Sequence, residues 1–319
     1  MRLNRFAIYA WSVLAYKLAV ILWGAYVRSS GSGAGCGSHW PLCNGEVIPT
    51  APHIKTLIEF THRLSSGLAL LLVIGLLIWA FRSFAPKHIV RTGALLSIFL
   101  MLTEALVGAG LVLFNLVADN RSIARALSMS AHLINTFLLI AALTLTAWWA
   151  TGGQPPNLRQ RKIAAWALGL SLFGILVLGV SGAVTALGDT LFPAQSLSQG
   201  LSQDLSPTAH FLIRLRLLHP FIALISVFCS ICCAGFVQLR YPAIWTKRFA
   251  RLFVSLSLFQ LGAGLLNVYL LAPIWLQLVH LLIADLVWIT MVLLSATVLS
   301  SPIIKTREET EVAEKVIAL

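Results

Sequence analysis

Charged residues are scarce in this sequence. Of its 319 residues only 11% are charged, and Asp and Glu together number 11. A typical soluble domain carries about 25% charged residues, so this composition excludes an ordinary cytosolic enzyme. It also excludes a disordered chain, which is poor in apolar residues and rich in charge. Five cysteines in a chain of this length exclude a small disulfide-framed protein as well.

Hydrophobic residues make up 58% of the sequence and are arranged in long runs. A membrane-spanning helix needs about 20 consecutive apolar residues. Eight such runs are present, at residues 7–28, 56–81, 92–117, 125–150, 163–187, 209–238, 248–271 and 274–300. The first run is too long for a signal peptide and lacks a small-residue cleavage site, so we expect it to be a true span. We therefore predict an all-α, multi-pass integral membrane protein with eight transmembrane helices.

The basic residues predict the orientation of these spans. A net charge of +12 would suit a nucleic-acid-binding protein, but in so apolar a chain an excess of Lys and Arg marks cytoplasmic loops. Fifteen of the 23 basic residues fall in one set of alternating segments, which includes both termini, and only four fall in the other set. We therefore expect both termini in the cytoplasm and no nucleic-acid partner. Lys17, inside the first run, is an unexpected charge.

The two halves of the sequence resemble each other. The matched features are Leu57–His62 with Leu215–His219, Gly108-Ala109-Gly110 with Gly262-Ala263-Gly264, and His132-Leu133 with His280-Leu281. Each half has four spans, so both enter the membrane in the same direction, as in parallel repeats related by an axis along the membrane normal. We predict two pseudo-twofold-related four-helix bundles, at residues 1–152 and 163–300, a cytoplasmic linker at 153–162 and a cytoplasmic tail at 301–319.

Four histidines lie inside the predicted spans, at a similar depth from the outer face. They are His62, His132, His219 and His280, one on each even-numbered span. A single intramembrane histidine is readily explained by a hydrogen bond across helices, but four at repeated positions indicate a metal cofactor. Zinc needs three or four converging ligands, whereas two histidines on separate helices suit the axial positions of a heme. The sequence thus predicts one heme site in each half.

Several arginines lie near the level of these histidines, where they either pair with heme propionates or extend into the membrane interface. They are Arg63, Arg121, Arg125, Arg214 and Arg216.

The halves differ at a few polar positions. Glu59 lies one helical turn before His62, and Arg216 occupies the equivalent position in the second half. This difference indicates one catalytic and one supporting site, although a structural pairing of Glu59 with Arg63 or Lys55 is the alternative. Cys36 and Cys43 in the first outer loop are suited to a disulfide, either as a staple or as a redox element.

Two further intramembrane carboxylates, Glu104 and Asp285, lack a repeated partner. We assign them no function, and we expect Glu104 to pair with a base on the cytoplasmic side.

Several spaced motifs resemble those of the heme A synthase family. They are Gly24-Ala25-Tyr26-Val27-Arg28, Ser30-Gly31-Ser32-Gly33, Cys36 followed by Trp40-Pro41-Leu42-Cys43-Asn44-Gly45, and Glu59-Phe60-Thr61-His62-Arg63, with His132, His219 and His280 on later spans. The resemblance covers nearly the whole chain. One departure is Glu104, which stands where the family usually has a glutamine, whereas Gln260 is kept in the seventh span.

The resemblance implies a function as well as a fold. Heme A synthases oxidise a methyl group of heme O to a formyl group by successive hydroxylation. The implied roles are substrate heme ligands for His62 and His132, heme b ligands for His219 and His280, a catalytic carboxylate for Glu59 and an outer-loop cysteine pair for Cys36 and Cys43. The implied setting is a bacterial cell membrane with its lipids, a heme O synthase and terminal oxidase assembly, with a homo-oligomer left open.

Two other functions are compatible with the same sequence. A di-heme b-type electron-transfer cytochrome would hold two permanent b hemes and leave their side chains unchanged. A transporter would use the parallel repeat without heme. The Glu59/Arg216 difference and the cysteines of only one outer loop favour the enzyme over the cytochrome.

Overall fold

The computed structural model describes residues 3–300, so the predicted cytoplasmic tail at 301–319 lies outside the described residues. In this range the chain forms nine helices, which are α1 (Arg5–Ser29), α2 (Ile54–Ser83), α3 (Ile89–Leu113), α4 (Ile123–Ala150), α5 (Lys162–Leu191), α6 (Leu197–Leu205), α7 (Phe211–Arg240), α8 (Ile244–Tyr269) and α9 (Ile274–Ser300). All but α6 are long and apolar enough to cross a membrane. The prediction of eight spans in an all-helical protein is confirmed.

Helices α3 and α8 end earlier than the sequence predicted, for the same reason. Asn115 and Leu271, two residues beyond the respective helix ends, adopt positive φ values of 53° and 58°. In each case the next residue donates its N–H back to a carbonyl in the last turn, from Leu116 to Leu111 and from Ala272 to Asn267. This is the left-handed helix end that stops an α-helix even where the sequence remains apolar.

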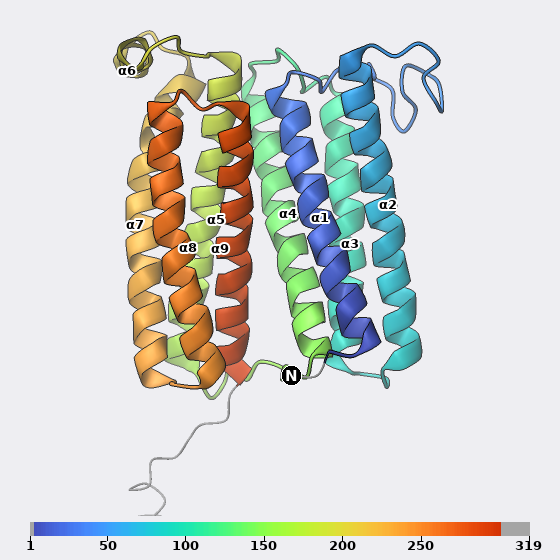
Figure 1. Cartoon of the computed structure of the whole chain (residues 1–319), viewed down its shortest axis with the longest axis vertical. Helices are drawn as coiled ribbons and strands as arrows, with labels where there is room; N and C mark the ends of the chain where they lie inside the picture. The colour runs from blue at the N-terminus through green and yellow to red at the C-terminus, as the bar shows by residue number, and fades with distance from the viewer. Residues whose placement is uncertain (1–2, 301–319) are drawn as a thin grey trace, which may run out of the picture.

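The eight long helices lie in two groups side by side (Figure 1). In the first group α1 contacts α2, α2 contacts α3, α3 contacts α4, and α4 returns to α1. The second group repeats this closed order with α5, α7, α8 and α9. Helix α6 lies over the top end of the second group, on the side opposite the N-terminus (Figure 1).

The core lies where the groups meet. Helix α9 contacts α1, α4 and α5, and 78% of its most apolar window is buried, against 22% for α2, α3, α5 and α8. Trp288 of α9 donates its indole N–H to the carbonyl of Phe137 in α4 at 2.7 Å, and the two rings stack with centroids 5.1 Å apart. The exposed apolar faces of the other helices are those that a lipid bilayer would cover.

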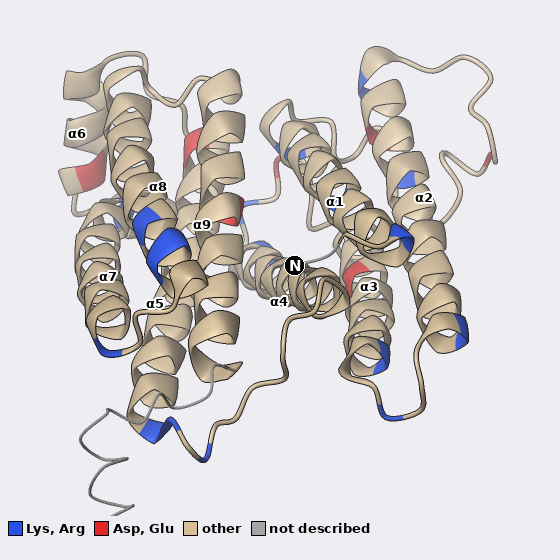
Figure 2. Cartoon of the chain, turned by 60° about the horizontal axis from the view of Figure 1, so that its bottom comes forward, with Lys and Arg blue, Asp and Glu red and all other residues tan. Residues whose placement is uncertain are grey.

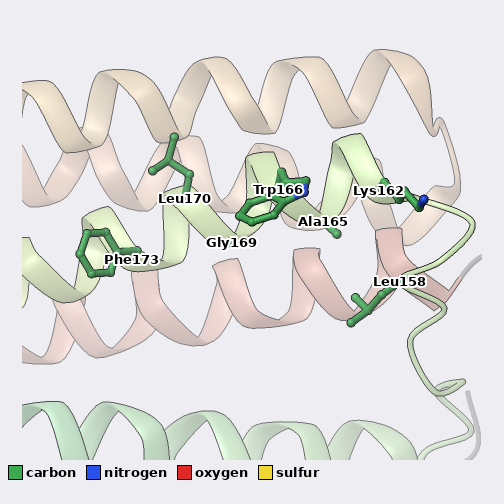
Figure 3. A pocket seen from close by; sticks show the side chains of 7 residues that line it. All are labelled: Leu158, Lys162, Ala165, Trp166, Gly169, Leu170 and Phe173. Carbon is green, nitrogen blue, oxygen red and sulfur yellow. The ribbon is translucent and has the colours of Figure 1, made fainter.

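One such exposed face carries a shallow groove along the start of α5. Its lining residues recur every three or four positions from Lys162 to Phe173 (Figure 3). Trp166 is 82% exposed there. The groove is apart from the four intramembrane histidines and has one basic group, Lys162, at its end. We therefore read it as lipid-facing surface.

Trp288→Ala should destabilise the protein strongly, because it removes a stacked ring and a buried hydrogen bond between the groups. Burial of an aromatic side chain in a packed core is worth about 3–5 kcal/mol, so thermal unfolding in detergent should shift to a clearly lower temperature. Trp166→Ala on the exposed groove is the matched control and should stay within about 0.5 kcal/mol of wild type. Equal effects of the two substitutions would contradict the proposed location of the core.

Candidate functional site

The four intramembrane histidines line one cavity of about 1090 Å³ that extends through both helix groups. His62 lies on α2, His132 on α4, His219 on α7 and His280 on α9. Each lies six to nine residues after the first residue of its helix, which is about 9–14 Å along the axis. The predicted common depth is thus present. His62 and His132 belong to the first helix group, and His219 and His280 belong to the second, so each group contributes two histidines to the cavity.

Each histidine ring packs against a glycine of the preceding membrane helix. A Cβ on Gly24 would lie 2.8 Å from Cε1 of His62, and one on Gly182 would lie 3.1 Å from Cε1 of His219. A Cβ on Gly264 would lie 3.2 Å from Cε1 of His280, and one on Gly108 would lie 3.8 Å from Cε1 of His132. Because these positions lack a side chain, the rings can approach the neighbouring backbone and keep an edge toward the cavity.

These contacts correct the register of the repeat in the third and seventh spans. The sequence comparison paired Gly108 with Gly262, but the glycine that meets the equivalent histidine in the second group is Gly264. The matching helix ends at Asn115 and Leu271 show the same two-residue difference. The structurally equivalent residue of Glu104 is therefore Gln260.

The ring nitrogens have different partners. Nδ1 of His219 lies 2.8 Å from the Ser181 hydroxyl, and Nε2 of His280 lies 3.2 Å from the Gln260 amide nitrogen. Nδ1 of His132 is 3.9 Å from Oε2 of Glu104. Among the described residues, Nδ1 of His62, His132 and His280 is buried without a hydrogen-bond partner.

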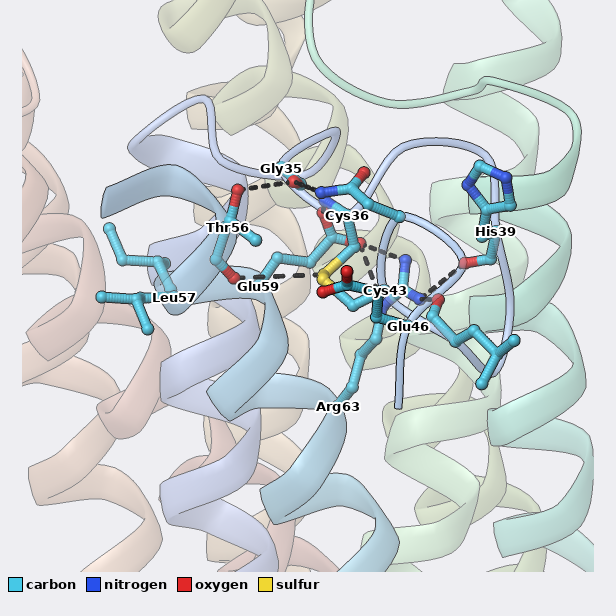
Figure 4. The surroundings of a disulfide bond; sticks show 12 residues. Gly35, Cys36, His39, Cys43, Glu46, Thr56, Leu57, Glu59 and Arg63 are labelled. Atoms are coloured by element: carbon cyan, nitrogen blue, oxygen red, sulfur yellow. Dashed lines mark hydrogen bonds and ion pairs between the residues drawn. A yellow bond between two sulfur atoms is a disulfide. The ribbon is translucent and has the colours of Figure 1, made fainter. Parts of the chain in front are cut away.

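Glu59 is buried at the outer end of the cavity in the first helix group, where its carboxylate accepts hydrogen bonds from a side chain and from the backbone (Figure 4). Its Oε1 accepts from Nε and Nη2 of Arg63 at 3.1 and 2.6 Å, and its Oε2 accepts the backbone N–H of Cys36 at 2.9 Å. Arg63 also donates Nη1 to the carbonyls of His39 and Leu42. The structural pairing with Arg63 that the sequence left open is present, and it fixes the first outer loop.

Cys36 and Cys43 form a disulfide in this loop, so the expected cysteine pair is confirmed. Both sulfurs are buried (Figure 4), and Trp40 and Pro41, between the two cysteines, line the cavity.

Arg216 anchors the second outer segment in an equivalent way. Its Nη2 lies 2.5 Å from Oδ1 of Asp204 in α6, and its Nη1 donates to Asp189 of α5 at 3.0 Å. Leu197 and Leu201 of α6 line the cavity from above. The prediction from sequence missed α6, because its nine residues include only three leucines among polar ones.

The arginines expected near the heme level separate into two sets. Arg63, Arg125 and Arg216 line the cavity, whereas Arg121 packs over the Phe192 ring and Arg214 donates to the Pro207 carbonyl. Arg28, which the sequence analysis did not single out for this role, also lines the cavity. It crosses between the helix groups, with bonds to the Ala186 carbonyl, Thr190 and Gln277.

Glu104 forms a buried ion pair with Lys17, with Oε1 3.4 Å from Nζ. Both residues line the cavity. The expectation that Glu104 pairs with a base is confirmed, but that base is the unexpected Lys17 in the middle of α1 and not a residue near the predicted cytoplasmic end. Asp285 is fully buried, and its carboxylate oxygens have no hydrogen-bond partner among the described residues.

This arrangement suits a planar, largely apolar cofactor held by two histidines. Within residues 3–300, no group of three or more His, Cys, Asp or Glu side chains is arranged to hold a metal ion directly. Two histidines on separate helices and a largely apolar cavity fit heme in each group. Arginines at the outer end are placed to meet anionic groups such as propionates.

Comparisons with known proteins identify a family that this chain matches over most of its length. Residues 7–292 match the COX15-CtaA family, described as cytochrome oxidase assembly protein. A protoheme IX farnesyltransferase of Thermus thermophilus is 54% identical over 298 residues, which are 93% of this chain and 49% of that protein. The chain therefore spans about half the length of this relative.

Shorter matches connect the chain to proteins named heme A synthase. The protein of an Exiguobacterium species is 31% identical over 59% of this chain and 60% of its own length. That of Halalkalibacterium halodurans is 39% identical over 45% of this chain and 46% of its own length.

Gly264→Val should weaken heme retention, because a branched side chain there would displace the His280 ring. We expect the heme affinity of the second helix group, measured by absorption in a His62→Ala background that removes the first-group site, to fall about tenfold or more, as when a ligand loses its supporting contacts. Gly262→Val is the matched control on the same helix, since nothing lies within 4 Å of a Cβ at that position. Equal loss of heme in both variants would indicate a general helix defect.

Proposed function

Because the chain belongs to the COX15-CtaA family of cytochrome oxidase assembly proteins, we propose that it is a heme A synthase, a membrane oxidoreductase that converts heme O to heme A. The observation that carries the proposal is the set of four histidines on one cavity, each seated on a glycine of the preceding helix. The proteins named heme A synthase among its relatives support the same activity.

The proposal assigns different tasks to the two helix groups. Residues 1–152 would bind the substrate heme O through His62 and His132, and residues 163–300 would hold heme b through His219 and His280, joined by the linker at 153–162. The second group lacks a counterpart of the Cys36–Cys43 loop and has Arg216 in place of Glu59. These differences support placing the chemistry in the first group.

We also propose that the groups are related by a pseudo-twofold axis along the membrane normal and that both termini are cytoplasmic. The repeated order of helix contacts supports the axis. The N-terminus, the linker and the end of α9 lie at one end of the molecule, where many of the Lys and Arg residues gather (Figures 1 and 2). This is the distribution expected at a cytoplasmic face.

Glu59 is the residue proposed to move a proton. Oxidation of a methyl group to a formyl group requires water or a bound hydroxyl to lose protons near the ring edge, and a fixed carboxylate within reach is a suitable base. Arg63 and the Cys36 N–H hold the Glu59 carboxylate in one orientation at the cavity wall. Heme b, when bound, would supply electron-transfer chemistry, while the protein supplies position and a dry environment.

The proposed substrate, heme O, is the product of a farnesyl transfer reaction. Heme O carries a farnesyl group, so a protoheme IX farnesyltransferase is the class of enzyme that must act before this one. The Thermus relative with that name includes a region 54% identical to this chain. We propose that the two activities cooperate and that the heme A product serves terminal oxidase assembly.

Glu59→Gln should abolish heme A formation when the protein is expressed in a membrane that contains heme O. Glutamine keeps an oxygen acceptor for Cys36 and a similar volume but cannot take up a proton as carboxylate does, so we expect a loss of about 100-fold or more. Pigment extraction and chromatography measure heme A, and the spectrum of the purified protein should show that heme b remains. Glu46→Gln, in the same loop but exposed, is the matched control and should retain activity.

A di-heme b-type electron-transfer cytochrome is the second candidate function. It is favoured by the similar packing of all four histidine rings against glycines. It requires two permanently bound b hemes and no heme A in the extracted pigment. Wild-type protein that yields this result would replace the first proposal with the second. Normal heme A formation by Glu59→Gln would leave the enzyme assignment in place but remove Glu59 as the base.

A further inference from the structure

A polar cluster lies beside His132, one helical turn deeper in the first helix group. Glu104 of α3 accepts from Thr136 at Oε1 (2.6 Å) and from Asn135 at Oε2 (2.7 Å), both on α4. Lys17 of α1 lies 3.4 Å from Oε1. Glu104 and Lys17 are 7% and 4% exposed, so the cluster is a buried ion pair with hydrogen bonds to both carboxylate oxygens.

The second helix group has no such cluster at the equivalent positions. The glycine–histidine contacts align Gly24 with Gly182, Gly108 with Gly264, and His132 with His280. With the same offsets, the residue equivalent to Lys17 is Ile175 and the residue equivalent to Glu104 is Gln260. Asn135 and Thr136 correspond to Ile283 and Ala284. In the second helix group, three apolar residues and the neutral amide of Gln260 therefore occupy these positions, and the helices keep the same arrangement.

Stability does not account for the ion pair. Burying two charges costs several kcal/mol per ion in desolvation, which their attraction offsets only when the geometry is favourable. The second group shows that the fold is built without these charges. The carboxylate instead lies where a ligand histidine needs a partner, because Nδ1 of His132 is buried, unbonded among the described residues, and 3.9 Å from Oε2 of Glu104.

We propose that Glu104 is a positioning residue for His132, with Lys17 as its counter-ion. A ring rotation that shortens the Nδ1–Oε2 distance by roughly 1 Å gives an ordinary hydrogen bond. His132 then donates from Nδ1 to the carboxylate and directs Nε2 into the cavity. Histidine ligands are commonly oriented in this way by a carboxylate, which also makes the ring a stronger donor to a metal. The assignment of His132 as a heme ligand rests on the proposed function.

The consequence is an electronic difference between the two heme sites. A ligand bonded to a carboxylate donates more electron density and favours oxidised iron, whereas the amide of Gln260 beside His280 carries no charge. The heme in the first group should therefore have a lower midpoint potential than it would with a neutral neighbour. This places the easier oxidation on the side where the proposed substrate is bound.

The decisive variant is the double substitution Lys17→Met with Glu104→Gln. It removes both charges of the ion pair together, so neither is left buried without the other, and it makes the first group resemble the second. Ferric protoporphyrin IX is titrated into the detergent-purified protein, and affinity and midpoint potential are measured by absorption. A background His280→Ala substitution removes the second-group signal and assigns the remaining one to the first group.

We expect the double variant to bind this heme about 10–100-fold more weakly at the first group and at a higher midpoint potential than wild type. Ser97→Ala is the control for loss of a buried polar side chain of α3 outside the cavity lining and should change neither value. Glu104→Asp, which keeps the charge, should fall between wild type and the double variant. Wild-type affinity and potential in a folded double variant would overturn the proposal.

Failure of the proposed function would look different. Wild-type protein would then make no heme A, while the effects of the double variant on affinity and potential would remain measurable with added heme. Conversely, heme A formation by wild type together with an unchanged potential in the double variant would retain the enzyme and remove the role of Glu104.

Discussion

The close approach of each histidine ring to a glycine is the contact on which the rest of this cavity depends. Small residues let membrane helices approach closely, and here they admit an imidazole against the neighbouring backbone. A methyl group at Gly24 or Gly182 would already overlap the space of His62 or His219. The helix spacing, the ring orientation and the depth of the cavity are therefore set together, on rigid elements rather than on loops.

This shared frame lets the two helix groups differ only where charge is placed. At the outer end, equivalent positions carry Glu59 and Arg216, and each anchors the segment that covers its half of the cavity. Glu59 holds the disulfide loop through the Cys36 N–H, while Arg216 holds α6 through Asp204. Deeper in the membrane, the residues equivalent to Lys17 and Glu104 are Ile175 and Gln260 in the other group. The same scaffold thus carries the carboxylates of Glu59 and Glu104 and the ammonium of Lys17 in one half, and Arg216 with two neutral residues at the equivalent positions in the other.

The sequence predicted the features that depend on composition and local periodicity. Runs of apolar residues gave all eight spans, and the depth of His62, His132, His219 and His280 followed from their distance to the helix starts. It did not predict contacts that need the relative rotation of helices. The pairing of Lys17 with Glu104 joins α1 to α3, and the two-residue register shift of Gly264 is visible only when its contact with His280 is known. The end of α3 was missed because Asn115 stops the helix by its backbone conformation within an apolar run.

The structural task of Glu59 and the chemical task proposed for it are compatible because they use different lone pairs. Each carboxylate oxygen has two acceptor positions. Oε1 is filled by Nε and Nη2 of Arg63, whereas Oε2 accepts only the Cys36 N–H among the described residues. One acceptor position on Oε2 is therefore left for a proton donor at the cavity wall. If Glu59 is the proposed base, the disulfide loop would both cover the cavity and select Oε2 as the atom that takes the proton, since the N–H of Cys36 fixes the direction in which its second lone pair points.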